Sequence, residues 1–276
     1  MSAPSGLPVG DLPSAGPATR DLAVPATALA IGAHPDDIEF GCGATLAKWA
    51  AAGCRLHHLI LTDGSKGSWD PGADVDRLAA ERMDECRSAA RVLDGSVNAP
   101  PSDAAPPDTG RLFFLGRRDG ELVNGVDERR EVVRILRLVR PAVVLGHDPW
   151  RRYRLHPDHR AAGWITTDSV VAARDPHFFP ELDLTPHRPD ALLLWEADQP
   201  NHVEGAAGYE RAKINALLCH RSQFESTMGI GGDSLGGPAG PVDDPGFTAK
   251  VHRQLAAHGR LAGLGSGEAF HLITDL

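Results

Sequence analysis

The sequence predicts an α/β protein with a Rossmann-like, doubly wound and mostly parallel sheet, built as three layers in a single domain. Short continuous apolar runs, typical of strands buried on both faces, alternate along the chain with longer segments of helical periodicity. Although 276 residues would allow two domains, no internal linker or repeat divides them. One domain over 25–276 is therefore expected.

The first expected elements form a strand–helix–strand unit. The run ALAIGA (28–33) is the first strand, and the segment 41–52 is a helix that ends at Gly53, a residue typical of helix ends. The run LHHLIL (56–61) is the second strand, closed by a Thr-Asp-Gly turn.

The middle of the chain repeats this alternation. Apolar residues recur at helical spacing over 75–93. The Pro-rich segment 98–109 is expected to be a surface loop, followed by a short strand over 111–115. A helix over 126–139 must end before Pro141, because the residue before a proline avoids helical geometry.

The second half supplies three more strands and three more helices. Apolar runs predict strands over 142–146 (AVVLG), 191–196 (ALLLWE) and 269–274, and periodicity predicts helices over 159–173, 208–220 and 248–261. The segment 228–246 is rich in Gly, Pro and Asp and is expected to be a long loop, in the role of a rim over the crevice.

Composition narrows the classes of function. The net charge of −9 and the lack of Lys/Arg blocks disfavour binding to nucleic acid or to anionic membrane. The sequence contains no run of about 18 apolar residues, so no membrane span is predicted. Residues 1–24 lack the pattern of a signal peptide and are expected to be a flexible or loosely docked arm. Four widely spaced cysteines indicate reduced thiols and a cytoplasmic location.

The tetrapeptide His34-Pro35-Asp36-Asp37 is the most informative local feature. It follows the first strand directly, and ligands of open α/β sheets bind at the carboxyl ends of strands. Adjacent carboxylates repel each other, so a cation or a proton would stabilise them. Alone, the two aspartates could instead cap a helix and complement its dipole.

A second cluster of the same type, His156-Pro157-Asp158-His159, comes shortly after the strand 142–146 and the turn His147-Asp148-Pro149. Two strand-end clusters can converge on one crevice in a doubly wound sheet. Three His or carboxylate ligands with one open position describe a catalytic zinc site. His147 and Asp148 are expected to support ligands or form a turn, not to bind the metal.

Six ordered segments together resemble the LmbE-like (PIG-L-like) family of zinc-dependent de-N-acetylases. The matching segments are AHPDDIEFGCGATLA (33–47), LTDGSKGS (61–68), ERMDECRSAARVLD (81–94), FLGRRDGEL (114–122), HPDH (156–159) and KINALLCHRSQF (213–224). That family includes deacetylases of N-acetylglucosaminyl-phosphatidylinositol, of the mycothiol and bacillithiol pathways, and of glycopeptide antibiotics.

The resemblance implies the roles of the site residues. His34, Asp37 and His159 would hold one zinc ion per chain, although other divalent metals also bind such sites. Asp36 would be the general base, and a protonated His156 would stabilise the oxyanion or protonate the leaving amine. Asp158 would orient His156 or a ligand histidine.

Substrate contacts are less well defined by the sequence. Asp63, Trp69, Tyr153 and His220 are candidates, each with a structural alternative: a turn for Asp63 and a helix end for His220. Glu39 is expected to be structural, and Asp119 a turn residue that could also reach substrate. Tyr153 lies three residues before His156, whereas some relatives place a tyrosine two residues before. The neighbouring Arg151, Arg152 and Arg154 are an alternative signal, for an anionic or phenolic acceptor.

The expected function is removal of an acetyl or other acyl group from an N-acetylglucosaminyl-type conjugate, such as a glycopeptide-antibiotic pseudoaglycone or another secondary metabolite. The alternative is a mycothiol-pathway deacetylase or a mycothiol S-conjugate amidase. A binding module that has lost its chemistry is disfavoured by the intact Asp36 and His156. A dinucleotide-dependent oxidoreductase is disfavoured because no GxGxxG turn follows the first strand. The sequence does not define the conjugate or the oligomeric state.

Overall fold

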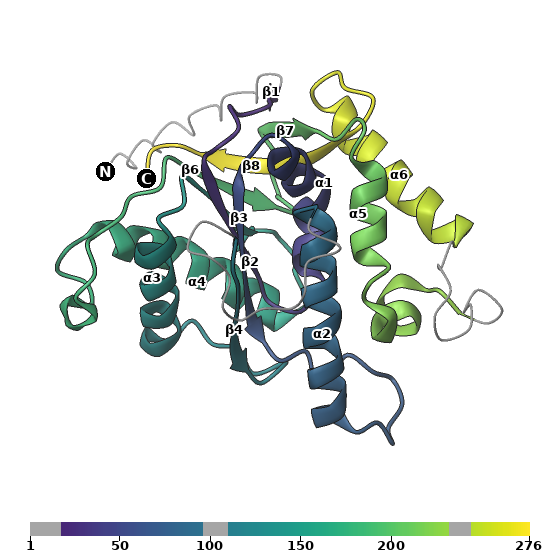
Figure 1. Cartoon of the computed structure of the whole chain (residues 1–276), viewed down its shortest axis with the longest axis horizontal. Helices are drawn as coiled ribbons and strands as arrows, with labels where there is room; N and C mark the ends of the chain where they lie inside the picture. The colour runs from purple at the N-terminus through teal and green to yellow at the C-terminus, as the bar shows by residue number, and fades with distance from the viewer. Residues whose placement is uncertain (1–17, 96–109, 232–243) are drawn as a thin grey trace, which may run out of the picture.

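A computed structural model of the chain describes residues 18–95, 110–231 and 244–276, which share one eight-stranded sheet (Figure 1). The strands are β1 (Thr19–Arg20), β2 (Thr27–Gly32), β3 (Arg55–Thr62), β4 (Leu112–Arg117), β5 (Val143–His147), β6 (Ala191–Trp195), β7 (His202–Gly205) and β8 (Gly267–Ile273). Their spatial order is β1-β7-β8-β6-β5-β2-β3-β4. Neighbouring strands are parallel, except that β8 runs antiparallel to both β6 and β7. The predicted, mostly parallel α/β sheet is confirmed.

Helices cover both faces of the sheet and complete the three predicted layers. Figure 1 shows α1 (Asp37–Ala51), α2 (Val75–Leu93), α5 (Glu210–Leu217) and α6 (Pro245–Arg260) on one face, and α3 (Val126–Val139) and α4 (Pro157–Arg174) on the other. Three short helical turns connect them: η1 (Pro180–Leu182), η2 (Arg221–Gln223) and η3 (Phe224–Met228).

The strand β2 shows why the central strands are continuously apolar. Successive side chains of a strand point to opposite faces. Ala28 and Ala30 accordingly pack into the hydrophobic cluster beneath α1 and α2, whereas Leu29 and Ile31 pack into the cluster beneath α3 and α4. Every residue of β2 is buried. A strand with two covered faces cannot show polar alternation.

The strand order reverses next to β2. From β2 the chain continues through α1 to β3 on one side of it, while β5 pairs with its other side and continues to β6 beyond. The carboxyl ends of β2 and β5 are thus adjacent, and the helices that follow them leave in different directions. Such a switch point opens the crevice in which α/β sheets bind ligands.

The helix α1 is broken at Cys42, whose φ of −147° interrupts the helical backbone. The carboxylate of Glu268, on β8, accepts hydrogen bonds from the backbone N–H groups of Ala44 (3.1 Å) and Thr45 (2.7 Å) after the break. Nζ of Lys213, on α5, lies 2.6 Å from the same carboxylate. The Glu268 carboxylate therefore accepts the backbone N–H groups that the break leaves without helical acceptors. Its ion pair with Lys213 connects α1 to α5 and β8.

Several boundaries differ from the sequence prediction. The helix α1 begins at Asp37, four residues before the predicted start, because its first turn carries buried acids that show no apolar period. The strand β7 was not predicted, since four residues are too few for a pattern. Of the predicted arm, 18–24 includes β1, which pairs with β7 and is docked on the sheet, and 1–17 lies outside the described residues.

Two predicted loops also lie largely or wholly outside the described residues: 98–109, and 232–243 within the predicted loop 228–246. All four cysteines are free thiols. Among the described residues, no helix has the length and apolar character needed to span a membrane.

Candidate active site

Two loops at the switch point carry the site. The first connects β2 to α1 and contains His34, Asp36 and Asp37, and the second follows β5 and leads to His156 and His159 at the start of α4. The two strands pair directly, with Ala30 opposite Leu145. Although the two motifs are more than a hundred residues apart, their side chains meet in one cluster.

The turn at Asp36 has a strained backbone. Its φ of 117° and ψ of −23° lie outside the regions that non-glycine residues ordinarily occupy. Arg82, buried on α2, supports the turn: its Nη2 donates to the carbonyl oxygen of Pro35 at 2.6 Å, and its Nη1 donates to that of Gly64 at 2.8 Å. The guanidinium thus joins the turn after β2 to the loop after β3.

The three predicted metal ligands converge. Nδ1 of His34 lies 3.2 Å from Nε2 of His159 and 3.4 Å from Oδ2 of Asp37, and Nε2 of His159 lies 3.2 Å from Oδ1 of Asp37. Zinc bonds of about 2.0–2.1 Å in tetrahedral geometry place ligand atoms roughly 3.3–3.4 Å apart. The donor set and its spacing therefore fit a zinc ion or a similar divalent metal.

Neighbouring side chains form further sets that could hold a metal ion. His34 and His159 also converge with His156, and Asp37 and His159 also converge with His147. The rings of His147 and His159 stack with their centroids 4.5 Å apart. His147, which sequence reasoning did not place among the ligands, thus lies inside the cluster.

The far nitrogen of His34 contacts two carboxylates. Its Nε2 lies 3.1 Å from Oδ2 of Asp158 and 3.2 Å from Oδ1 of Asp119. Burial lowers the pKa of His34, but the hydrogen bonds with Asp119, Asp158 and Asp37 outweigh burial and raise it well above its usual value. Of the two predicted partners of Asp158, His34 is the one that its carboxylate contacts.

Asp119 was expected to be a turn residue that could also reach substrate. Its backbone N–H donates to Oδ1 of Asp63, and the N–H groups of Gly120 and Leu122 donate to Asp158. The turn therefore brings the Asp119 side chain against His34. The sequence carries no local signal for this contact, because it depends on the loop after β4 crossing to the start of α4.

The two adjacent aspartates of the first motif have opposite electrostatic environments. Burial, partly offset by the Arg82 guanidinium and reinforced by the charge of Asp37, raises the pKa of Asp36 to about 6. Burial acts on Asp37 too, but His159 and His147 lower the pKa of that carboxyl well below its usual value. Asp37 is thus a stable anion, and Asp36 can exchange a proton near neutral pH.

His156 lies at the mouth of the cluster. Its ring centroid is 4.6 Å from that of His34 and 4.7 Å from that of His159. Burial and the charges of those two histidines lower its pKa. The protonated state of His156 that the resemblance implies for the reaction stays a prediction.

The four candidate substrate contacts occupy different settings. Oδ1 of Asp63 accepts the N–H groups of Ser65 and Asp119, so Asp63 joins two loops. Trp69 is 74% exposed and Tyr153 is 93% exposed, with a strained φ of 59°. His220 is fully buried with Nε2 3.4 Å from Oε2 of Glu39, so its ring presents no surface to a substrate.

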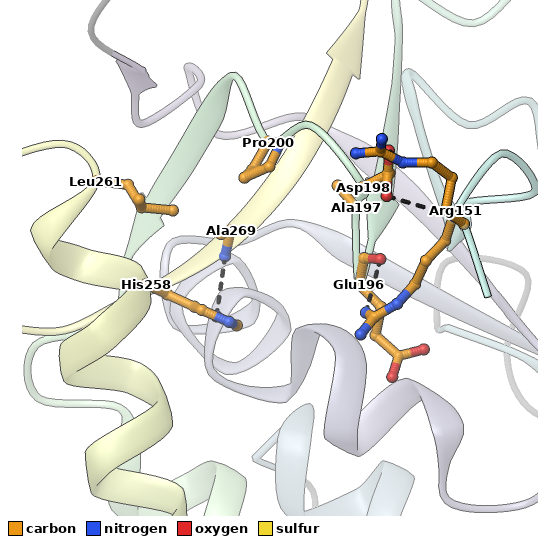
Figure 2. A pocket seen from close by; sticks show the side chains of 9 residues that line it. Arg151, Glu196, Ala197, Asp198, Pro200, His258, Leu261 and Ala269 are labelled. Carbon is orange, nitrogen blue, oxygen red and sulfur yellow. Dashed lines mark hydrogen bonds and ion pairs between the residues drawn. The ribbon is translucent and has the colours of Figure 1, made fainter. Parts of the chain in front are cut away.

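The arginines next to Tyr153 are already paired. Nη1 of Arg151 donates to the carbonyl oxygen of Glu196 at 2.9 Å, Arg152 pairs with Asp198 at 2.8 Å, and Arg154 pairs with Glu196 at 2.6 Å. Figure 2 shows Arg151, Glu196 and Asp198 along a cavity of about 390 Å³ that Pro200, His258 and Leu261 also line. The pairing weakens the alternative of an anionic acceptor, because Arg152 and Arg154 already face carboxylates.

Comparisons with known proteins find one matching family and several similar enzymes. The family described as "PIG-L: GlcNAc-PI de-N-acetylase" matches residues 29–170, which span both motifs. The diacetylchitobiose deacetylase of Thermococcus kodakarensis is 32% identical over 199 residues, covering 71% of this chain and 69% of the relative. The 1D-myo-inositol 2-acetamido-2-deoxy-alpha-D-glucopyranoside deacetylase of Streptomyces scabiei is 34% identical over 267 residues, covering 90% and 80%.

A solved structure matches at the level of the whole fold. The N,N'-diacetylchitobiose deacetylase of Pyrococcus horikoshii superposes with a TM-score of 0.75 at 26% identity, covering 91% of this chain and 84% of the other.

Proposed function

The chain belongs to the GlcNAc-PI de-N-acetylase (PIG-L) family of deacetylases, and from that premise we propose that it is a zinc-dependent hydrolase of the acetamide group of an N-acetylglucosamine conjugate. The convergence of Nδ1 of His34, Nε2 of His159 and the Asp37 carboxylate beside a carboxyl group of raised pKa carries this proposal. The three donor residues would hold the metal, and the Asp36 carboxyl group would accept and release the proton.

Each residue has a definite part in the proposed reaction. His34, Asp37 and His159 would hold the ion, which would supply polarisation of the acetyl carbonyl and acidification of water. Asp36 removes the proton from the attacking water and, with a pKa near 6, delivers it to the leaving amine. Asp119 and Asp158 hold the ring of His34 through its Nε2–H.

His156 enters this scheme as a neutral ring. Because its pKa is lowered, it acts by donating an N–H hydrogen bond to the acetyl oxygen or by holding the amine, not as a standing cation. Its position at the mouth, against both His34 and His159, supports this part.

The carrier of the amino sugar is proposed from the relatives. Two of them are deacetylases of different carriers, diacetylchitobiose and a 1D-myo-inositol 2-acetamido-2-deoxy-alpha-D-glucopyranoside. Chitobiose is a dimer of glucosamine, so both carriers contain an acetylated glucosamine unit. We propose the N-acetylglucosaminyl unit as the shared determinant and a cytoplasmic site of action, and we keep the pseudoaglycone of a glycopeptide antibiotic as a third carrier.

A panel of acetylated conjugates tests the proposal. The zinc-loaded protein is incubated with N,N'-diacetylchitobiose, the acetylated inositol glucosaminide and an N-acetylated glycopeptide pseudoaglycone, and the released acetate and free amine are measured. We expect at least one member of the panel to release the two products in equal amounts. Asp36→Asn is the control. Acetate from no member of the panel contradicts the proposal. Release of a cysteinyl group from a mycothiol S-conjugate, without acetate release from the panel, would favour the amidase instead.

A further inference from the structure

His147, the last residue of β5, lies against the proposed metal ligands. It is 1% exposed, its Nε2 is 3.2 Å from Oδ2 of Asp37, and its ring stacks on that of His159. Two roles fit this position. His147 could bind the metal itself, or it could hold Asp37 in the orientation that binding requires.

The other ring nitrogen distinguishes the two roles. Nδ1 of His147 faces Nε1 of Trp195 at 3.1 Å and Nη1 of Arg154 at 3.4 Å. An indole N–H and a guanidinium can only donate. Nδ1 must therefore accept, and the hydrogen of the neutral ring lies on Nε2, where it points at the Asp37 carboxylate.

Two further contacts do not change this assignment. Oε2 of Glu196 lies 3.6 Å from Nδ1, which is too long for a hydrogen bond. The N–H of Ala33 points at Nε2 from 3.5 Å, which is at the limit of a hydrogen bond and longer than the contacts at Nδ1. Burial lowers the pKa of His147, and the charges of Asp37 and Glu196 outweigh burial and raise it. A cationic ring also carries a hydrogen on Nε2, so this nitrogen is not a free ligand in either state.

The position of Trp195 is fixed by close packing. Trp195 pairs with His147 across β5 and β6 and is fully buried. A Cβ built on Gly41 of α1 would lie 2.5 Å from a carbon of the Trp195 ring, so the indole lies directly against the helix backbone. The ring cannot turn its N–H away from His147 without displacing α1.

The two carboxylate oxygens of Asp37 therefore have different partners. Oδ2 accepts the backbone N–H of His34 at 2.7 Å and faces Nε2–H of His147, and it also lies 3.4 Å from Nδ1 of His34. Oδ1 faces Nε2 of His159 and accepts no backbone N–H of the described residues. We propose that His147, held as the Nε2–H donor by Trp195, is a positioning residue that directs Oδ1 of Asp37 to the metal and is not a fourth ligand. This inference rests on the proposed function, because it requires that Asp37 binds the ion.

Metal affinity and the metal's spectrum test the role. His147→Phe removes the donor, and Trp195→Phe removes only the indole N–H with part of the ring. Zinc affinity, measured by competition with a chelator, should fall about 10- to 100-fold in His147→Phe and by a smaller factor in Trp195→Phe. The absorption bands of the cobalt(II)-loaded protein should keep their positions and intensity in both variants, because no ligand is lost.

Trp49→Phe is the matched control. Trp49 is also fully buried, but its indole N–H has no hydrogen-bond partner among the residues that the structure describes. This variant loses the same volume and should bind zinc like the wild type. Equal losses of affinity in Trp49→Phe and Trp195→Phe would mean that packing alone is responsible, and would overturn the role of the Trp195 N–H.

Other outcomes separate this inference from the proposed function. Cobalt bands that change in His147→Phe as expected for a lost nitrogen ligand would make His147 a ligand, and unchanged zinc affinity would deny it any role. A wild-type protein that binds no zinc would contradict the proposed function itself. Long-range ¹H–¹⁵N NMR of the zinc-loaded wild-type protein tests the inference without any variant. A hydrogen on Nε2 of His147 supports the inference, and a metal-bound Nε2 overturns it.

Discussion

Oδ2 of Asp36 lies 3.4 Å from Nη2 of Arg82, and the same Nη2 donates to the carbonyl oxygen of Pro35. Arg82 is therefore both the support of the strained turn and the nearest cation to the proposed base. Its charge holds the pKa of Asp36 below the value that burial alone would produce. One buried side chain thus couples the geometry of the base to its proton affinity.

Arg82→Met should raise the pKa of Asp36 further, because an opposite charge nearby favours the ionised carboxylate. The acidic limb of the kcat/KM profile should move to higher pH by roughly one to three units. The measurement is a pH profile of acetate release. Arg87→Met, an exposed change on the same helix, is the control. An acidic limb that stays at the wild-type pH in Arg82→Met would show that Arg82 does not set the proton affinity of the base.

Asp36→Asn should keep the metal and lose turnover. The amide cannot accept the proton of the attacking water, and general base catalysis contributes about 10²- to 10⁴-fold. Turnover should fall at least about a hundredfold while elemental analysis finds one zinc ion per chain. Near wild-type turnover would remove Asp36 from the mechanism, and loss of zinc would make it a ligand.

The raised pKa of Asp36 also predicts a change of stability with pH. The folded pKa of about 6 lies above the value of the unfolded chain, so the stabilising effect of the bound proton is present below about pH 4 and is lost as pH rises through 6. This contribution amounts to about 3 kcal/mol. Urea unfolding of metal-free wild type and Asp36→Asn at pH 5 and pH 7.5 should show the variant gaining relative stability at the higher pH. A difference independent of pH would contradict the shift.

Alanine substitutions of His34, Asp37 or His159 should each remove stoichiometric zinc. Each substitution takes one of three convergent donors from the proposed site. The metal content after dialysis, together with the affinity from chelator competition, checks this. Full zinc in any one of the three variants would exclude that residue as a ligand, and Trp49→Phe again serves as the control.

The buried Lys213–Glu268 pair predicts a large loss of stability. Lys213→Met leaves the Glu268 carboxylate uncompensated next to the broken helix α1, and breaking a buried pair in this way costs about 3–5 kcal/mol. Arg87→Ala breaks an exposed pair with Asp84 and should cost less than about 1 kcal/mol. Chemical unfolding of both variants gives the comparison, and similar losses in the two would refute the importance of burial.

The parts of the fold that could be predicted are those with a local signal. The strands β2, β3, β5 and β6 are short apolar runs. One His/Asp motif directly follows β2 and the other comes shortly after β5, so their meeting at one edge of the sheet followed from the parallel topology. The family resemblance, carried by six ordered segments, is confirmed by the comparisons. The helix α1 begins before its predicted start because its first turn contains buried acids that are stabilised by tertiary contacts.

The contacts that organise the cluster had no such signal. Asp119 reaches His34 because a loop from the edge of the sheet crosses to α4, and Trp195 reaches His147 because β5 and β6 are neighbours. Both facts depend on strand order, which apolar periodicity does not encode. The strands β1 and β7 were missed for a different reason, since two and four residues contain no measurable period.

The position of β8 has a consequence for the time course of folding. This strand, close to the carboxyl end, lies between β6 and β7, and β1 pairs with the rest of the sheet only through β7. During synthesis β1 is made before β7 and β8, so it cannot join the other strands until both have left the ribosome. The strands β2 to β6, which flank the proposed metal ligands, can assemble beforehand. Of the described strands, the one made first is therefore among the last to join the sheet.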